Sequence, residues 1–291
     1  MSRRRAITAA IALVAVAIPV WLWPLGGRKV IRAWLKSPPP PGARFHDPEG
    51  LGVDAEGNIY VADEDTGTFW MLDRAGKELA RFSGWTTGDS MVVIAPRHVV
   101  AIGRHDLVEF TIEGAEPRLV RRMSRRGHGE GEFEDPEGLS RDANGDLYAT
   151  DEDHRRVLVF GREGEYARMF KVDHDPEGVC VFEDRVYVTF SKDGYVACYG
   201  KDGTFKFKFA GVKEPDFVCV GPDKRLYVTD KRGARVCVFD LEGQPLGTIE
   251  AGFDDPEDLA FDPDGNLVVA DGGNHRIVVL TREGKVVRVI E

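Results

Sequence analysis

Cysteine is scarce in this chain, which has only four in 291 residues. Four cysteines cannot supply a disulfide framework for a protein of this size, so the fold has to depend on a hydrophobic core. The chain also lacks the Gly-x-Ser-x-Gly, Cys-x-x-Cys and phosphate-loop motifs that point to particular enzyme classes. It is 42% apolar and 30% charged, an ordinary globular composition, and its length suits one large domain or two small ones.

Basic residues are in deficit over most of the chain. Residues 1–42 contain seven Lys and Arg and no acidic residue, so residues 43–291 carry a net charge of −17. A body this acidic repels phosphate backbones. We therefore expect no nucleic-acid partner.

Residues 1–27 predict a signal anchor that spans a membrane. Three arginines at positions 3–5 precede an uncharged run at 6–27, and about 20 helical residues cross a bilayer core. The short basic tail favours a cytoplasmic N-terminus and an extracytoplasmic body. A cleaved signal peptide is the alternative, although no convincing cleavage site follows the apolar run. Residues 28–42 predict a stiff Pro-rich linker.

The remainder of the chain is a repeat. Asp-Pro-Glu-Gly occurs at 47–50, 135–138 and 175–178, and degenerate copies occur at 214–217 and 255–258. The last four copies are 40, 39 and 41 residues apart, whereas the first interval of 88 residues hides a further copy near Asp89. This spacing predicts six repeats, near residues 43–84, 85–124, 125–171, 172–210, 211–250 and 251–291.

Each repeat predicts four short antiparallel strands joined by turns rich in Gly, Asn and Asp. Units of this length and content are typical of propeller blades, so we expect an all-β fold, a single six-bladed β-propeller over 43–291. The first repeat begins with its inner strand and the last ends with its outer strand. The ring therefore has to close by packing between blades, unless residues 28–42 contribute a strand.

Two segments resemble NHL-repeat propellers. Residues 125–138, which read Arg-Arg-Gly-His-Gly-Glu-Gly-Glu-Phe-Glu-Asp-Pro-Glu-Gly, look like the linker and blade start of that family, and residues 269–277 resemble the body of its repeat. Within the second segment the Asn274–His275 pair matches the family name, although Arg276 stands where the name has Leu. The resemblance implies protein-binding, RNA-binding, sensor or peptidyl-hydroxyglycine lyase functions, and related six-bladed propellers include calcium-dependent lactonases.

An acidic residue follows the proline position in every repeat. In a four-stranded blade this position lies where the chain enters the innermost strand, at the mouth of the central channel. The repulsion between crowded carboxylates is reduced by a bound cation, by a nearby arginine or by protonation through a raised pKa. Hard divalent cations prefer oxygen ligands. The pattern therefore predicts a metal site, most simply for Ca²⁺, formed by Glu49, Asp89, Glu137, Glu177, Asp216 and Glu257.

The loop after the second strand opens on the same face of a propeller. Its acidic residues predict contacts to a ligand at the channel mouth; they are Glu64, Asp65, Glu152 and Asp153. A structural alternative remains open, because carboxylates also cap turns and because Arg156, Arg235 and Arg276 could neutralise the ring. The Asp that ends the second strand in four repeats, at positions 63, 151, 230 and 271, is expected to support the fold.

Histidine and cysteine carry weaker signals. His46 and His174 both precede their proline by two residues and could share a transition metal only if the channel were narrow. The four cysteines, Cys180, Cys198, Cys219 and Cys237, fit small buried apolar positions.

Two functional hypotheses follow. The first is a membrane-tethered, non-catalytic recognition or sensor module that presents an acidic channel mouth to a protein, peptide or glycan. The second is a metal-dependent hydrolase or lyase of the gluconolactonase, paraoxonase or peptidyl-hydroxyglycine lyase type. An enzyme needs a few unlike residues that converge on one metal, and the near-uniform ring favours binding.

Overall fold

The structure is a computed structural model that describes residues 39–84, 89–103 and 105–291. The predicted anchor at 1–27 and most of the predicted linker lie outside the described residues. Within these residues no helix is long and apolar enough to cross a membrane. The described residues belong to one compact unit.

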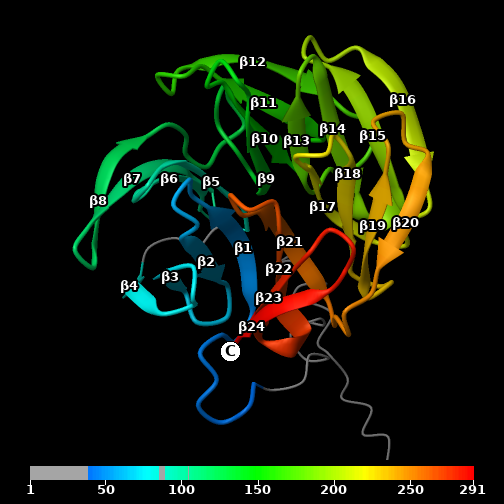
Figure 1. The fold of residues 1–291 in the computed structure, drawn as a ribbon. Helices are drawn as coiled ribbons and strands as arrows, with labels where there is room; N and C mark the ends of the chain where they lie inside the picture. Colours follow the sequence, from blue (N-terminus) through cyan, green and yellow to red (C-terminus); the bar gives the residue numbers. More distant parts are fainter. Residues whose placement is uncertain (1–38, 85–88, 104) are drawn as a thin grey trace, which may run out of the picture. The chain divides into compact units, whose positions relative to one another are not determined.

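Six four-stranded antiparallel sheets make up this unit, and each has its strands in sequence order. Figure 1 shows the sheets arranged around a centre, with the first strand of each sheet innermost. The first three blades contain β1 (Pro48–Val53), β2 (Ile59–Asp63), β3 (Thr68–Leu72) and β4 (Glu78–Ser83); β5 (Met91–Ala95), β6 (His98–Ile102), β7 (Leu107–Glu113) and β8 (Glu116–Arg122); and β9 (Pro136–Arg141), β10 (Leu147–Asp151), β11 (Arg156–Phe160) and β12 (Tyr166–Lys171).

The other three blades follow the same plan, with two short 3₁₀ helices added. They contain β13 (Val179–Phe182), β14 (Arg185–Phe190), η2 (Ser191–Asp193), β15 (Tyr195–Gly200) and β16 (Phe205–Ala210); β17 (Pro215–Val220), β18 (Leu226–Asp230), β19 (Arg235–Phe239) and β20 (Pro245–Ile249); and β21 (Pro256–Phe261), β22 (Leu267–Asp271), η3 (Gly272–Asn274), β23 (Arg276–Leu280) and β24 (Val286–Ile290). The predicted six-bladed β-propeller is confirmed.

Asp-initiated turns join the strands within a blade. In the β1–β2 turn the Asp54 carboxylate accepts hydrogen bonds of 2.9 Å from the backbone N–H groups of Glu56 and Asn58. In the β3–β4 turn Asp73 accepts equivalent bonds from Ala75 and Lys77, and Gly76 has a φ of +84° that a residue with Cβ adopts only under strain. These local contacts explain why short polar sequences fix the strand order.

The hydrophobic core is divided into six clusters, and each cluster lies between two neighbouring blades. One of these clusters joins the last blade to the first, since Leu51 and Val61 pack with Val268 and Ile277 there. No described strand crosses from one blade into another sheet, and the first and last blades meet through this cluster. We therefore expect each blade to depend on both of its neighbours for stability.

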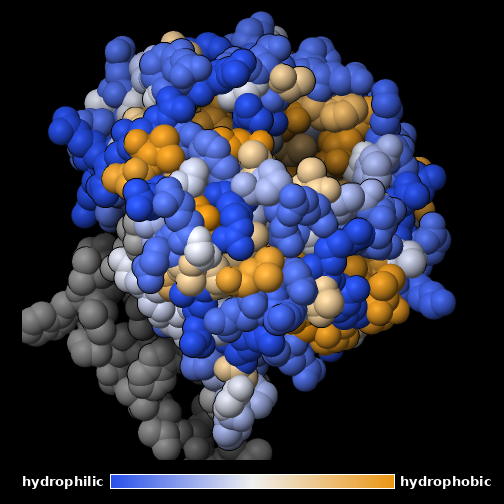
Figure 2. Space-filling view, turned by 60° about the vertical axis from the view of Figure 1, so that its left-hand side comes forward, coloured by the Kyte–Doolittle hydropathy of each residue, from blue (hydrophilic) through white to orange (hydrophobic). Residues whose placement is uncertain are grey.

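The outward strands are more polar and more exposed than the inner ones. Figure 2 shows a largely hydrophilic face on which apolar side chains form separate patches. Exposed apolar residues lie on the outermost strands, among them Leu119 on β8, Phe205 on β16 and Leu246 on β20.

Candidate functional site: the acidic channel mouth

The residues that follow each proline lie where the innermost strands begin. Pro48 pairs with Asp63 and Pro136 pairs with Asp151, so the start of the first strand and the end of the second lie at the same end of the blade. In both blades the register shifts after the proline, which marks a bulge. The bulge turns the next acidic residue away from a regular strand position.

The structure collects the carboxylates into two clusters rather than a uniform ring. Carboxylate oxygens of Glu49, Glu64 and Asp89 lie within 4.8 Å of one another. Asp135, Glu137 and Glu152 form the second cluster with the same limit on distance. Both clusters combine residues from the start of the first strand with one from the loop after the second strand.

Glu49 has a poorly compensated environment at the mouth. The residue is half-buried, and its Oε2 atom is hidden from solvent with no hydrogen-bond donor among the described residues. Burial, followed by the negative charges of Asp89, Glu64 and Glu257, raises its pKa well above the ordinary glutamate value. A cation next to this carboxylate would reverse that shift.

Lysine compensates the adjoining part of the mouth, on the fifth and sixth blades. The ammonium group of Lys231 forms ion pairs with Glu257 and with Asp216, the latter at 3.6 Å. Glu257 is only 1% exposed, so this pair is removed from water. Two of the six residues predicted to bind a metal are therefore held by an internal cation.

A second lysine acts beside the other cluster. Lys192, from η2, pairs with Glu152 and lies 2.8 Å from Asp175, which also binds Arg155 at 2.8 Å. Burial alone would lower the pKa of Lys192, but its hydrogen bonds to Asp175 and Glu152 raise it overall. The Glu152 cluster is thus partly neutralised.

The remaining predicted site residues are placed separately. Glu177 is half-buried, and its backbone N–H donates to the Thr189 carbonyl at 3.0 Å. Asp65 and Asp153 are exposed on their loops and belong to neither of the two carboxylate clusters. The structure places Glu64 and Glu152 in these clusters, whereas the role of Asp65 and Asp153 in ligand binding stays a prediction.

The repeated Asp at the end of the second strand is structural, as expected. Asp151 is fully buried and accepts hydrogen bonds from the backbone N–H groups of Glu134 and Asp135. Its other oxygen pairs with Arg156 at 2.9 Å. The same pairing joins Asp230 to Arg235 and Asp271 to Arg276, at 3.0 and 2.7 Å. The three arginines therefore neutralise these aspartates.

Histidine and cysteine take no part in the clusters. Among the described residues, neither group of three that could hold a metal includes His46 or His174. The four cysteines are free, and three of them are buried. Burial raises the pKa of the Cys180 thiol to about 12, so it stays protonated and behaves as a small apolar group.

The sequence patterns above did not predict that lysines neutralise carboxylates at the mouth, although the sequence contains a signal for it. The position after the second-strand Asp is Glu64 in the first repeat, Glu152 in the third and Lys231 in the fifth. A change of sign at a position that faces the channel mouth indicates an ion pair. In the fourth repeat, where Phe190 replaces the Asp, the lysine comes two residues later.

Comparison with known proteins agrees with this architecture. The NHL repeat family matches residues 253–280. The chain carries an NHL repeat and folds as a six-bladed β-propeller. No curated protein matches this NHL propeller by sequence.

Solved structures resemble this NHL propeller over most of its length. A streptogramin B lyase structure is 12% identical and superimposes with a TM-score of 0.63, covering 86% of this chain and 84% of that one. A virginiamycin B lyase from Staphylococcus aureus is 14% identical, with a TM-score of 0.62 and 84% of each chain covered. A gluconolactonase from Xanthomonas campestris is 20% identical, with a TM-score of 0.67 and coverage of 79% and 85%. At these identities the likeness shows the fold alone.

Proposed function

We propose that this NHL propeller is a non-catalytic recognition or sensor module that binds a protein, peptide or glycan at its acidic channel mouth. The observation that carries the proposal is the Glu49 carboxylate, which is held among like charges with one oxygen that no described donor satisfies. Such an arrangement disfavours the charged form in isolation and favours it beside a cation. The mouth is therefore suited to a ligand that brings positive charge or that binds through a metal.

Calcium fits the cluster of Glu49, Glu64 and Asp89. Ca²⁺ binds carboxylate oxygens at about 2.3–2.6 Å, so oxygens on opposite sides of one ion are about 5 Å apart. The oxygens of this cluster lie within 4.8 Å of one another, which satisfies that limit. A bound calcium would supply positive charge for an acidic or hydroxyl group of the ligand, while the three carboxylates would hold it in place.

A calcium titration of the full-length protein tests this proposal. After chelation, added Ca²⁺ should raise the melting temperature, since a ligand at a hundredfold excess over Kd stabilises the folded state by about 2.7 kcal/mol. The double variant Glu49→Gln with Glu64→Gln should lose this response. Binding to peptide and glycan arrays in the presence of Ca²⁺ should be lost in the same variant.

A matched control separates a site from a general charge effect. Glu113→Gln with Glu116→Gln removes two charges from the β7–β8 turn, where Glu113 pairs with Arg118 on the surface at 2.8 Å. This control should keep the calcium response and the array binding. Unchanged melting of the wild type on chelation would exclude the calcium site, and equal array binding by both double variants would exclude recognition at the mouth.

A metal-dependent hydrolase or lyase is the second candidate. The uneven placement of Lys192 and Lys231 favours it, because an enzyme needs unlike groups around one metal and the mouth is less uniform than the sequence indicates. Calcium-dependent turnover of lactones by the wild type, abolished by Glu49→Gln, would replace the recognition proposal with this one.

Attachment to a membrane through residues 1–27, with the body extracytoplasmic, completes the proposal. Its support is the uncharged run and the basic tail before it. Full-length protein should stay in the membrane fraction after a high-salt wash, and a variant beginning at Pro39 should be released. Recovery of the full-length chain in the salt wash would overturn this part.

A further inference from the structure

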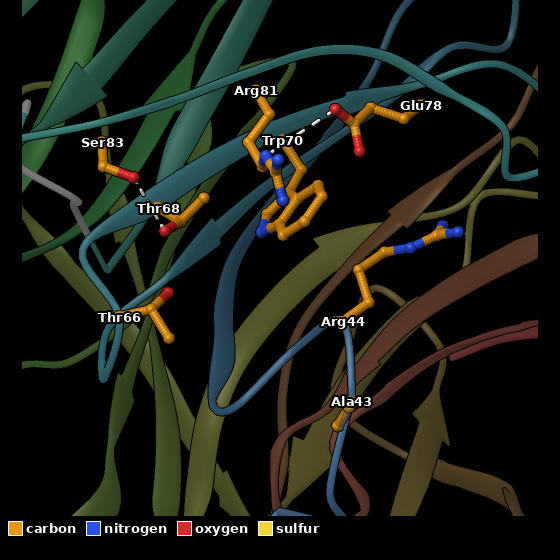
Figure 3. A pocket seen from close by; sticks show the side chains of 9 residues that line it. Ala43, Arg44, Thr66, Thr68, Trp70, Glu78, Arg81 and Ser83 are labelled. Atoms are coloured by element: carbon orange, nitrogen blue, oxygen red, sulfur yellow. Dashed lines mark hydrogen bonds and ion pairs between the residues drawn. The ribbon is translucent and has the colours of Figure 1, made fainter.

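A pocket lies at the edge of the first blade. Its volume is about 470 Å³, and its walls come from the segment before β1, the start of β3 and both ends of β4. None of its lining residues belongs to either carboxylate cluster. Figure 3 shows the indole of Trp70 beside the guanidinium of Arg81, with Thr66, Thr68 and Arg44 nearby.

The Trp70 side chain has a buried N–H group without a hydrogen-bond acceptor among the described residues. Its side chain is buried, with only 6% of the residue exposed, and the ring packs edge-on against Phe45 at 5.8 Å. The Arg81 guanidinium lies 5.0 Å from the indole centroid. The indole Nε1–H nevertheless has no acceptor among the described residues. Buried donors are almost always paired, but this atom is hidden from solvent, so a ligand can accept its hydrogen bond only when a lining side chain such as Arg81 shifts to uncover it.

The repeats provide an internal comparison for this position. The residues that stand at the same distance from the strand-three landmark in the other blades are Val108, Leu158, Ala197, Cys237 and Val278. All are apolar or weakly polar, and none has an N–H on its side chain. A residue demanded by the fold would recur, whereas this tryptophan occurs in one blade and lines a pocket.

The charges around the pocket are positive overall, although the body is strongly acidic. Arg44 and Arg81 line it, and Glu78 is its one acidic residue. Glu78 lies 3.7 Å from the Arg81 Nε, an exposed contact that contributes little. Arg44 donates one hydrogen bond to the Gly76 carbonyl at 2.7 Å and keeps further N–H groups on its guanidinium. Two guanidinium groups therefore favour an anionic ligand.

Hydroxyl groups complete the lining. Thr68 and Ser83 form a hydrogen bond of 3.0 Å with each other across β3 and β4 (Figure 3), and the Thr66 hydroxyl donates to Asp63 at 2.7 Å. The Thr68–Ser83 pair retains lone pairs and can rotate, so it can serve polar groups on a ligand body.

We propose that this pocket binds a small organic molecule through its carboxylate group. One carboxylate oxygen accepts the Trp70 indole N–H, and Arg81 and Arg44 supply the positive charge. A carboxylate suits this set better than a neutral ligand because guanidinium groups favour carboxylate acceptors and because the single N–H needs one acceptor. The Thr68–Ser83 hydroxyl pair contacts the remainder of the molecule.

Fluorine NMR of the full-length protein labelled with fluorotryptophan tests this assignment. Succinate, benzoate and glucuronate are titrated separately, and the Trp70 signal is identified as the one missing from Trp70→Phe. At least one carboxylate should shift that signal saturably, while the matching neutral amides should not. Calorimetry should show that Trp70→Phe and Arg81→Gln each weaken binding by about tenfold or more, because each removes one charged or donating contact.

Two control measurements separate binding in the pocket from general effects of charge and stability. Arg118→Gln removes an exposed arginine from β8 and should bind like the wild type. Trp70→Phe keeps an aromatic ring at this position but also removes buried ring atoms, so its melting temperature is measured first and binding is compared at a temperature at which both proteins are folded. The proposal is overturned if none of the three carboxylates binds saturably, if inorganic phosphate binds as tightly as the best carboxylate, or if Arg118→Gln weakens binding as much as Arg81→Gln does.

Discussion

The Asp258 carboxylate accepts a hydrogen bond of 2.9 Å from the backbone N–H of Leu51, a residue 207 positions earlier in the chain. Asp258 stands where the first, third and fourth repeats have the glycine of Asp-Pro-Glu-Gly. The side chain therefore bridges the seam between the last blade and the first. Other seams use serine for the same purpose, since Ser140 accepts a hydrogen bond of 3.0 Å from the N–H of Val181.

Asp258→Ala should loosen this seam. The Leu51 N–H would be left buried without an acceptor, and an unsatisfied buried donor costs about 1 to 3 kcal/mol. We expect the free energy of unfolding, measured in urea, to fall by that amount. Ser140→Ala removes the equivalent bond at another seam and should give a loss of similar or smaller size. Full stability of Asp258→Ala would show that packing alone holds the ring closed.

Gly178 permits close contact between the fourth and fifth blades. A Cβ at this position would lie 2.6 Å from the Asp216 carbonyl oxygen and 2.9 Å from the Phe217 Cα, and backbone atoms cannot move aside as a flexible side chain can. Gly178→Ala should therefore destabilise the protein by about 2 kcal/mol or more through overpacking.

Gly114→Ala is the control for this substitution. Gly114 has a φ of +64° and no atom within 4 Å of the added carbon, so only backbone strain of about 1 kcal/mol is expected. Equal losses for the two variants would contradict the close-contact explanation.

Lys231 should be required for folding stability although it lies at the channel mouth. Lys231→Met would leave the buried Glu257 carboxylate without its cation, and breaking a buried pair in this way costs about 3 kcal/mol. The double variant Lys231→Met with Glu257→Gln removes both charges and should recover most of the loss. Urea unfolding of the two variants measures the difference. A double variant less stable than Lys231→Met would show that the pair does not act as a unit.

Glu49 should give the folded protein a specific dependence on pH. Its pKa is raised in the folded state, chiefly by burial, so the folded protein keeps this proton to higher pH than the unfolded chain does. The free energy of unfolding therefore falls as the pH rises from the ordinary glutamate value, about 4.3, through the raised value.

Substitution of Glu49 tests that dependence in the presence of a chelator. Above the raised pKa, Glu49→Gln should melt at a higher temperature than the wild type, because it avoids the buried charge. Below about pH 4 the wild-type group is protonated in both states, so the two melting temperatures should converge. A constant difference between wild type and variant at every pH would rule out the titration of Glu49 as the cause.

Local sequence determined the strands, the turns and the number of blades. Asp-Pro-Glu-Gly, the second-strand Asp and the Gly of the β3–β4 turn act through contacts within a few residues or within one hairpin, such as Asp73 with Ala75 and Lys77. A fixed period of such local signals specifies antiparallel four-stranded units, and these bury their faces only by stacking in a ring. The role of Asp151 as a structural residue could be predicted for the same reason.

The tertiary structure alone decided which carboxylates remain uncompensated. All six acidic positions look alike in the repeat. Lys231 forms ion pairs with Asp216 and Glu257, whereas it lowers the pKa of Glu49 too little to offset burial and the neighbouring negative charges. From the sequence, Trp70 is likewise one more apolar residue of the third strand. Only the structure shows that Arg81 and Arg44 line the same pocket. Ion pairs and pockets depend on distances of a few ångströms between segments far apart in the chain, and the repeat period fixes the blade but not those distances.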